Sequence, residues 1–161
     1  MPVPSGLHRG FWFDRANSLL KILYNGTSVL QFNATSLVSA FGFTSSHATT
    51  GIGYSTGAGG AVTQITSAAT AVTLNTVCGQ ITTVALTTAA AAEEAFVVNN
   101  STVDANDVVA VSTTYAGAGK PIVFVTNMGA GVFTVNISNV DAAALNAVLV
   151  VNFAVIKSVV A

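Results

Sequence analysis

The sequence predicts an all-β protein: an antiparallel β-sandwich of jelly-roll type that follows an N-terminal arm and a β-hairpin. Composition is the first reason, because 24 Val and 20 Thr among 161 residues favour a pleated, half-buried backbone surface. The second is the pattern, since short runs that alternate apolar with Thr or Asn positions are separated by turn residues. The third is the scarcity of charge, because only 7% of the residues are Asp, Glu, Lys or Arg, too few for a disordered chain.

The N-terminal part comprises an arm and a hairpin. Two prolines and two glycines among the first ten positions, Pro2, Pro4, Gly6 and Gly10, favour an extended, mobile arm. The strongest local signal is a hairpin of Leu19–Tyr24 and Thr27–Phe32 around Asn25-Gly26, because both residues of this dipeptide suit the positive φ angles of a type I′ turn. The segment Thr35–Ser46 fits either a short helix or another strand.

A glycine-rich segment separates the hairpin from the rest of the chain. Five of the ten residues in Gly51–Gly60 are glycine, which is typical of a linker or a sharp chain reversal. We therefore expect an attachment domain over residues 1–50 and a β-sandwich module over residues 51–161. Eight strands, the number in a jelly roll, are predicted for the module. They are Val62–Thr66, Ala71–Asn75, Gln80–Leu86, Ala95–Ser101, Asp107–Tyr115, Ile122–Asn127, Val132–Val140 and Ala147–Val159.

The charge distribution excludes some partners and indicates another. Five basic against six acidic residues leave a net charge of −1, so binding to nucleic acid through phosphate contacts is not expected. Apolar runs are interrupted by Thr, Asn, Ser and Gly, so a membrane helix is not expected either. The strands between residues 62 and 86 have no charged residue to guard a free sheet edge. We therefore expect a homo-oligomer, closed by three-fold or two-fold symmetry.

Residues suited to nucleophilic or metal chemistry are few and dispersed. His8 and His47 are the only histidines and Cys78 is the only cysteine. A catalytic Ser or Cys needs a histidine base that a third group orients, and no spacing here indicates one. One cysteine and two distant histidines do not make a zinc site. The glycine-rich segment also lacks the lysine of a phosphate-binding loop.

The acidic pairs have structural explanations. Glu93 and Glu94 are neighbours at the start of a strand or in a loop, so their carboxylates are expected to point apart. The spacing of Asp104 and Asp107 indicates a turn in which carboxylates accept hydrogen bonds from nearby backbone. It provides too few ligands for a calcium loop. We expect no catalytic residue, no cofactor, no metal and no enzyme activity.

An aromatic run near the N-terminus is not explained by a lone β-sandwich. Its rings can cover an open end of the sandwich or the hairpin, or they can anchor the chain to a partner, since aromatic residues and Arg dominate binding hot spots. This part of the chain has three basic residues and one acidic residue, which suits an acidic docking surface. The candidate anchoring residues are Arg9, Phe11, Trp12, Phe13 and Arg15.

Four segments from Gly51 onward form a recurrent pattern: Gly53–Gln64, Val72–Asn75, Cys78–Thr82 and Asn139–Lys157, which ends Val-Asn-Phe-Ala-Val-Ile-Lys. Through these segments the sequence resembles a module of tailed-bacteriophage virion proteins. The resemblance implies a β-sandwich on the outside of a virion, either as a capsid decoration (cement) protein or as part of a fibre. It implies no enzyme activity and does not extend to residues 1–50.

Together these observations favour a homotrimeric capsid decoration protein, made in the host cytoplasm and located on the outer surface of the capsid. Its expected partners are the major capsid protein, contacted by residues 1–50, and further copies of itself, with no nucleic acid and no membrane. The alternative is a tail- or head-fibre domain that binds a host surface glycan. Loops at a tip of the sandwich would then bind, with Tyr54, Tyr115 and Asp107 as candidates.

Overall fold

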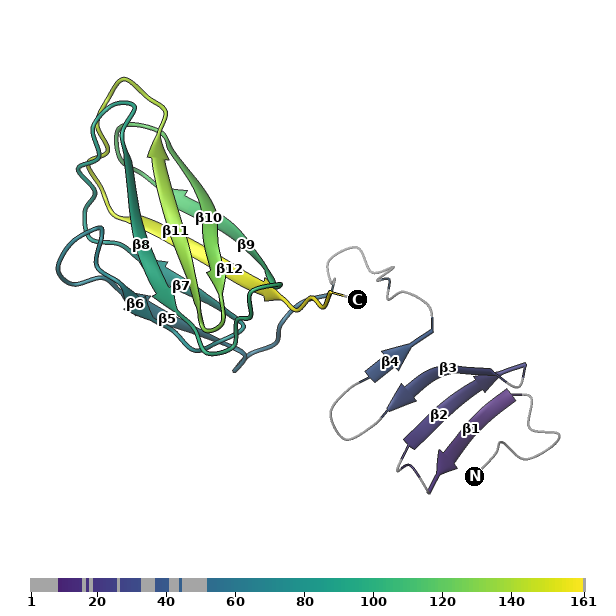
Figure 1. The fold of residues 1–161 in the computed structure, drawn as a ribbon. Coiled ribbons are helices and arrows are strands. Elements are labelled where there is room, and N and C mark those ends of the chain that lie inside the picture. The colour runs from purple at the N-terminus through teal and green to yellow at the C-terminus, as the bar shows by residue number, and fades with distance from the viewer. Residues whose placement is uncertain are drawn as a thin grey trace. The chain divides into compact units, whose positions relative to one another are not determined.

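The chain folds into two compact units, Met1–Gly53 and Tyr54–Ala161 (Figure 1). The structure, a computed structural model, describes residues 9–15, 17, 19–25, 27–32, 37–40, 44 and 52–160. These residues form twelve strands and no helix, which confirms the all-β class. Within the same residues there is accordingly no helix that could cross a membrane.

The first unit is a four-stranded antiparallel sheet with its strands in chain order. Its strands are β1 (Arg9–Asp14), β2 (Leu19–Tyr24), β3 (Thr27–Phe32) and β4 (Leu37–Ser39). The predicted hairpin is confirmed with its bounds. At its turn Asn25 has a φ of 51°, a conformation that Asn tolerates better than most residues.

In the first unit one prediction is corrected, and one open alternative is decided. The aromatic run does not lie in a mobile arm, because Arg9–Asp14 pairs with β2 over its whole length. Aromatic side chains suit a strand, and the partner strand satisfies their backbone groups. Within Thr35–Ser46, the strand alternative is confirmed for Leu37–Ser39, which pairs with β3.

The second unit contains two four-stranded sheets. The order is β5-β7-β12-β9 in one, called the β12 sheet, and β10-β11-β8-β6 in the other, called the β11 sheet. Each of the eight strands overlaps one of the eight predicted runs. They are β5 (Gly59–Thr63), β6 (Val72–Thr73), β7 (Cys78–Thr82), β8 (Glu93–Asn99), β9 (Val108–Tyr115), β10 (Pro121–Gly129), β11 (Val132–Asn139) and β12 (Leu149–Ile156).

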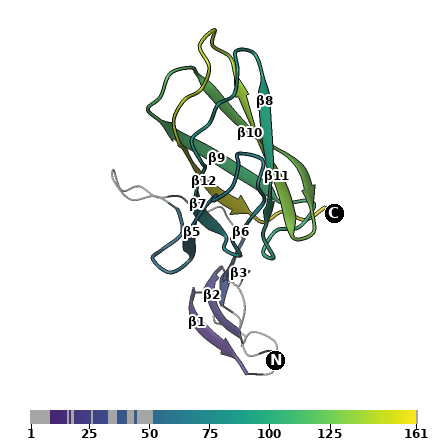
Figure 2. The same cartoon turned by 90° about the vertical axis from the view of Figure 1, so that its left-hand side faces the viewer.

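The strand order departs from a wholly antiparallel arrangement at two places. β5 is parallel to β7, and β6 is parallel to β8. Parallel neighbours need a crossover connection. The chain provides this crossover because successive strands from β5 to β10 belong alternately to the β12 sheet and the β11 sheet. The two sheets lie as two layers in both views (Figures 1 and 2). The expectation of purely antiparallel sheets is wrong at these pairs, and the strand order does not confirm jelly-roll connectivity.

The two layers share one hydrophobic core. Every second residue of β11 and of β12 is buried, as the two-residue period of a strand requires. Phe133 of β11 and Phe153 of β12 meet across the layers, with ring centroids 5.7 Å apart and planes tilted by 59°. This pair shows that the sheets pack face to face.

Candidate functional site

The first candidate surface is one face of the N-terminal sheet. Phe11 and Phe13 are two residues apart in β1, so they lie on the same face. Strand register adds further apolar residues to that face, because cross-strand partners point to the same side. We call this surface the apolar face, and its exposed members are Phe11, Phe13, Leu20, Phe32 and Leu37.

The apolar face is open to solvent. Phe11 is 73% exposed and Phe13 is 55% exposed, and the other three members are between 37% and 45% exposed. Among the described residues of this unit, Leu23 is the one buried apolar side chain. The described residues of this unit form one sheet with no second layer over this face, and contiguous exposed apolar residues of this kind mark interaction sites.

The opposite face of the same sheet has a polar cluster around Trp12. The Lys21 Nζ lies 5.3 Å from the centroid of the Trp12 ring and 3.5 Å from Asp14 Oδ2. Asn17 Nδ2 donates to Asp14 Oδ2 at 3.0 Å. This hydrogen bond, with a smaller contribution from Lys21, lowers the pKa of the buried Asp14 carboxyl below its ordinary value. The carboxylate therefore holds Lys21 against the indole ring.

The predicted anchoring residues are thus divided between two faces. Phe11 and Phe13 share the apolar face, whereas Trp12 lies on the other side with Lys21. Arg15 is exposed just beyond the end of β1. The side chain of Arg9 is not among those described. The sequence alone contained a signal for this division, because adjacent residues of any strand point to opposite faces.

The structure does not bring the three glycan-binding candidates together. Tyr54 donates a hydrogen bond from its hydroxyl to the Val155 carbonyl, near the end of β12. Asp107 immediately precedes β9, at the same end of the sheet. Tyr115 pairs with Leu149 at the opposite end, about 23 Å along the strands from the first two. No single tip of the sandwich presents all three residues.

Four of the five acidic residues of the second unit, Glu94, Asp104, Asp107 and Asp141, make structural contacts. The turn expected at Asp104 and Asp107 is present, with Asp104 N donating to Asp107 Oδ2 at 2.8 Å. Glu93 is exposed, and Glu94 accepts a hydrogen bond from Thr88 Oγ1 at 2.7 Å. Over the parts of the chain that the structure describes, no three His, Cys, Asp or Glu side chains are grouped to hold a metal ion. His8 and His47 lie outside those parts.

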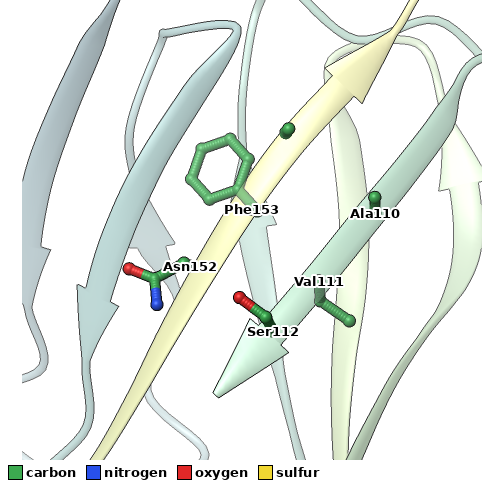
Figure 3. A pocket seen from close by; sticks show the side chains of 6 residues that line it. Ala110, Val111, Ser112, Asn152 and Phe153 are labelled. Atoms are coloured by element: carbon green, nitrogen blue, oxygen red, sulfur yellow. The ribbon is translucent and has the colours of Figure 1, made fainter. Parts of the chain in front are cut away.

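A second candidate surface was not predicted from the sequence. The outer side of the β12 sheet has a shallow hollow of about 230 Å³ between β9 and β12. Its outward side chains are those of Ala110, Ser112, Asn152 and Ala154, and Figure 3 shows Ser112 beside Asn152. Small side chains on both strands produce the hollow. Finding it required the pairing of β9 with β12, which lie far apart in the sequence.

The comparisons with known proteins add no relative to this picture. No family model matches the sequence, and no curated protein and no solved structure matches it either. The resemblance to phage virion modules therefore stays a prediction.

Proposed function

We propose that this protein is a structural virion component that decorates the outside of a tailed-phage head. In this role the N-terminal sheet docks on the major capsid protein through its apolar face, and the sandwich is displayed outward. One observation supports the docking step above all: five large apolar side chains are exposed on one face of a single-layer sheet. A partner that covers this face supplies the second layer that the sheet lacks.

The energetics favour attachment through several copies. Burying one large apolar side chain contributes about 1.5–3 kcal/mol. The five members of the face are on average already about half buried, so covering them contributes about 4–8 kcal/mol, while association itself costs about 4–15 kcal/mol. A single copy would bind weakly on this account. Copies that associate with each other while contacting one shell gain avidity without any new contact.

The anchoring set is narrower in this proposal than the sequence indicated. Phe11 and Phe13 make the docking contact, and Trp12 supports the sheet from its other face. Arg15, exposed just after the end of β1, contributes positive charge near the aromatic pair, and Arg9 is the first residue of the same strand. This charge would speed encounter with an acidic shell more than it would tighten the complex.

The remaining parts of the proposal follow from the same role. The protein is non-enzymatic, is made in the host cytoplasm and ends on the outer surface of the capsid. It needs no cofactor, binds no nucleic acid or membrane and associates with itself. The homotrimer expected from the sequence stays a prediction.

Cosedimentation with phage heads stripped of accessory proteins tests the docking step. The wild-type chain should bind saturably, and a Phe11→Ser, Phe13→Ser variant should bind at least about 100-fold more weakly, because two aromatic anchors are lost. Phe124→Ser is the matched control, since Phe124 is a 39% exposed phenylalanine on the β11 sheet. It should bind like the wild type.

Two results would contradict the docking proposal. Undiminished binding by the double variant would show that the apolar face is not the anchor. Absence of wild-type binding to any stripped head would remove the decoration role. A glycan array would then test the alternative, a fibre domain that recognises a host surface glycan.

A further inference from the structure

We propose that the hollow between β9 and β12 binds one neutral sugar residue of a glycan. This binding activity goes beyond the proposed docking on a phage head and does not depend on it, because docking uses the other unit of the chain. Three observations support the site: its volume suits a single ring, a row of neutral polar side chains borders it, and the sheet face around it has no charge.

The hollow has the size and the lining for one six-membered ring. Its volume is about 230 Å³, whereas a cavity of about 150 Å³ already holds a benzene ring. The methyl groups of Ala110 and Ala154, which are opposite each other in the register, provide an apolar floor. A pyranose ring presents C–H groups on its faces and hydroxyls around its rim. It can therefore lie on this floor with its hydroxyls directed to the side.

A row of neutral polar side chains borders the floor. Ser112 is opposite Asn152, and Asn152 is opposite Gln80, so the three lie in one line across β9, β12 and β7. Figure 3 shows Ser112 beside Asn152 at the hollow. Gln80 Nε2 donates to Asn152 Oδ1 at 3.1 Å, which restrains both amides. The row then offers a ligand the Asn152 amide nitrogen as a donor, the Gln80 amide oxygen as an acceptor and the Ser112 hydroxyl as either.

The hydroxyls of a sugar match this row. Each hydroxyl both donates and accepts, so it can bond to an amide nitrogen, an amide oxygen or another hydroxyl. Ligand sites commonly combine an apolar lining with a few polar groups that fix the orientation of the ligand. A wholly apolar ligand would cover the Asn152 donor without giving it a partner. A ring with apolar faces and a polar rim satisfies both parts of the hollow.

The sheet face around the hollow restricts the ligand to one without charge. Register identifies its outward positions, which alternate with the buried residues of β7 and β12 and contain no Asp, Glu, Lys or Arg. They are Gly59, Ala61, Thr63, Cys78, Gln80, Thr82, Val108, Ala110, Ser112, Thr114, Val150, Asn152, Ala154 and Ile156. An acidic sugar would lose hydration here and gain no counter-charge. We therefore expect neutral sugars to bind more tightly than acidic ones.

One sugar residue should bind weakly in so shallow a site. A hexose has about 12 non-hydrogen atoms, and the ligand efficiency of drug-sized molecules then corresponds to a dissociation constant of about 1–10 mM. Many copies held on one shell would bind a glycan-covered surface with higher avidity, without any new contact in the hollow.

NMR titration of the full chain with glucose, galactose and mannose tests the site. At least one of these sugars should shift the backbone amide signals of residues 110–112 and 152–154 saturably, with a dissociation constant of about 1–10 mM. The uronate of the same sugar is the matched probe, because it differs by one carboxylate. It should bind at least about tenfold more weakly, since no counter-charge faces it.

Two variants and their controls locate the binding. Ala110→Leu should weaken it at least about tenfold by filling the hollow, and Asn152→Ala about fivefold by removing a hydrogen-bond donor. Ala95→Leu and Asn136→Ala make the same changes on the outer side of the β11 sheet and should bind like the wild type. Unchanged signals from the β11 sheet would show that the two hollow variants are folded.

Three results would overturn the proposal. In the first, none of the three sugars shifts these amide signals at about 50 mM, several times the expected dissociation constant. In the second, the shifts persist undiminished in Ala110→Leu. In the third, the uronate binds as tightly as the neutral sugar. Cosedimentation with phage heads reads docking separately, so the failure of either proposal leaves the other testable.

Discussion

Lys157 Nζ lies 2.5 Å from Asp107 Oδ2 and thereby ties the segment after β12 to the loop before β9. The Asp107 side chain is fully buried, and about half of the Lys157 side chain is exposed. Ser158 N donates to the other Asp107 oxygen at 3.1 Å, and Asp104 Oδ2 lies 3.1 Å from the ammonium group. Each oxygen of the Asp107 carboxylate thus has a partner, and these contacts fix the segment after β12 to the loop before β9.

This ion pair predicts how the stability of the second unit depends on pH. The Lys157 hydrogen bond holds the pKa of Asp107 below its ordinary 3.8, and the same contact raises the pKa of Lys157 above its ordinary 10.5. Because the pKa of Asp107 is lower in the folded chain, the ionised carboxylate stabilises the fold above pH 3.8. This stabilisation is lost as the pH falls through the pKa of Asp107 in the folded state. Because the pKa of Lys157 is higher in the folded chain, the charged ammonium stabilises the fold below pH 10.5. This stabilisation is lost as the pH rises through the pKa of Lys157 in the folded state.

Calorimetry from pH 3 to pH 11 checks this dependence. The Tm should be level near neutrality and fall on both flanks. Asp107→Asn should lower the neutral Tm and flatten both flanks, because the carboxylate is absent and Lys157 keeps only Asp104 as a charged neighbour. Glu93→Gln, at an exposed carboxylate, is the control and should keep the wild-type profile. An Asp107→Asn profile parallel to that of the wild type would disprove the assignment.

Asn139 joins the loops at the other end of the β11 sheet. Its side chain is fully buried; the two N–H groups of Nδ2 are shared among three backbone carbonyls, and Oδ1 accepts from two backbone N–H groups, all at 2.8–3.2 Å. The acceptors are Thr88, Ala89 and Ala143, and the donors are Lys120 and Asp141.

Asn139→Ala should therefore lower the free energy of unfolding by more than about 3 kcal/mol, because several buried backbone groups lose their partners together. Asn136→Ala on the same strand removes one half-buried hydrogen bond, to Thr126 Oγ1 at 2.7 Å, and should cost about 1 kcal/mol. Urea unfolding followed by circular dichroism measures both changes. Equal effects would show that the loops do not depend on Asn139.

The contact between the Phe133 and Phe153 rings predicts a large effect of truncation. Phe133→Ala should cost about 3–5 kcal/mol, because it opens a cavity between the two layers. Phe124→Ala removes the same ring from an exposed position and should cost less than about 1 kcal/mol. The same unfolding assay compares them. A small effect at Phe133 would mean that the layers can close over the gap.

Much of the fold could be predicted from local patterns. Asn25-Gly26 determines its hairpin by backbone preference, and the runs that become β11 and β12 alternate with the period of a strand. The parallel pairing of β5 with β7 could not be predicted, because register between separated segments depends on tertiary packing rather than on either run.

Of the two candidate surfaces, one could likewise be predicted from a local pattern and the other could not. The separation of Phe11 and Phe13 from Trp12 follows from strand alternation once Arg9–Asp14 is recognised as a strand, and its aromatic residues were a signal for that. The hollow on the outer side of the β12 sheet had no such signal. Ala110 and Ala154 are ordinary small residues until the register places them side by side.

Alanine is ordinarily more stabilising than glycine inside a strand, but at Gly79 we expect alanine to be destabilising. It lies in β7 on the inner side of the β12 sheet, opposite Phe153. A Cβ atom there would lie 2.7 Å from a Leu74 methyl carbon, 2.9 Å from the Gly60 carbonyl oxygen and 3.0 Å from the Phe153 ring. The carbonyl belongs to the paired backbone of β5 and cannot move aside as a side chain does. Gly79→Ala should therefore cost about 1–3 kcal/mol.

Gly53→Ala is the matched control, because a Cβ at Gly53 meets nothing within 4 Å and its φ is not in the left-handed region. It should be neutral or stabilising by up to about 1 kcal/mol, since alanine restricts the unfolded chain. Urea unfolding of both variants gives the comparison. If Gly79→Ala were as stable as Gly53→Ala, β5 would have to move away from β7, and amide hydrogen exchange in Gly59–Thr63 would then be faster than in the wild type.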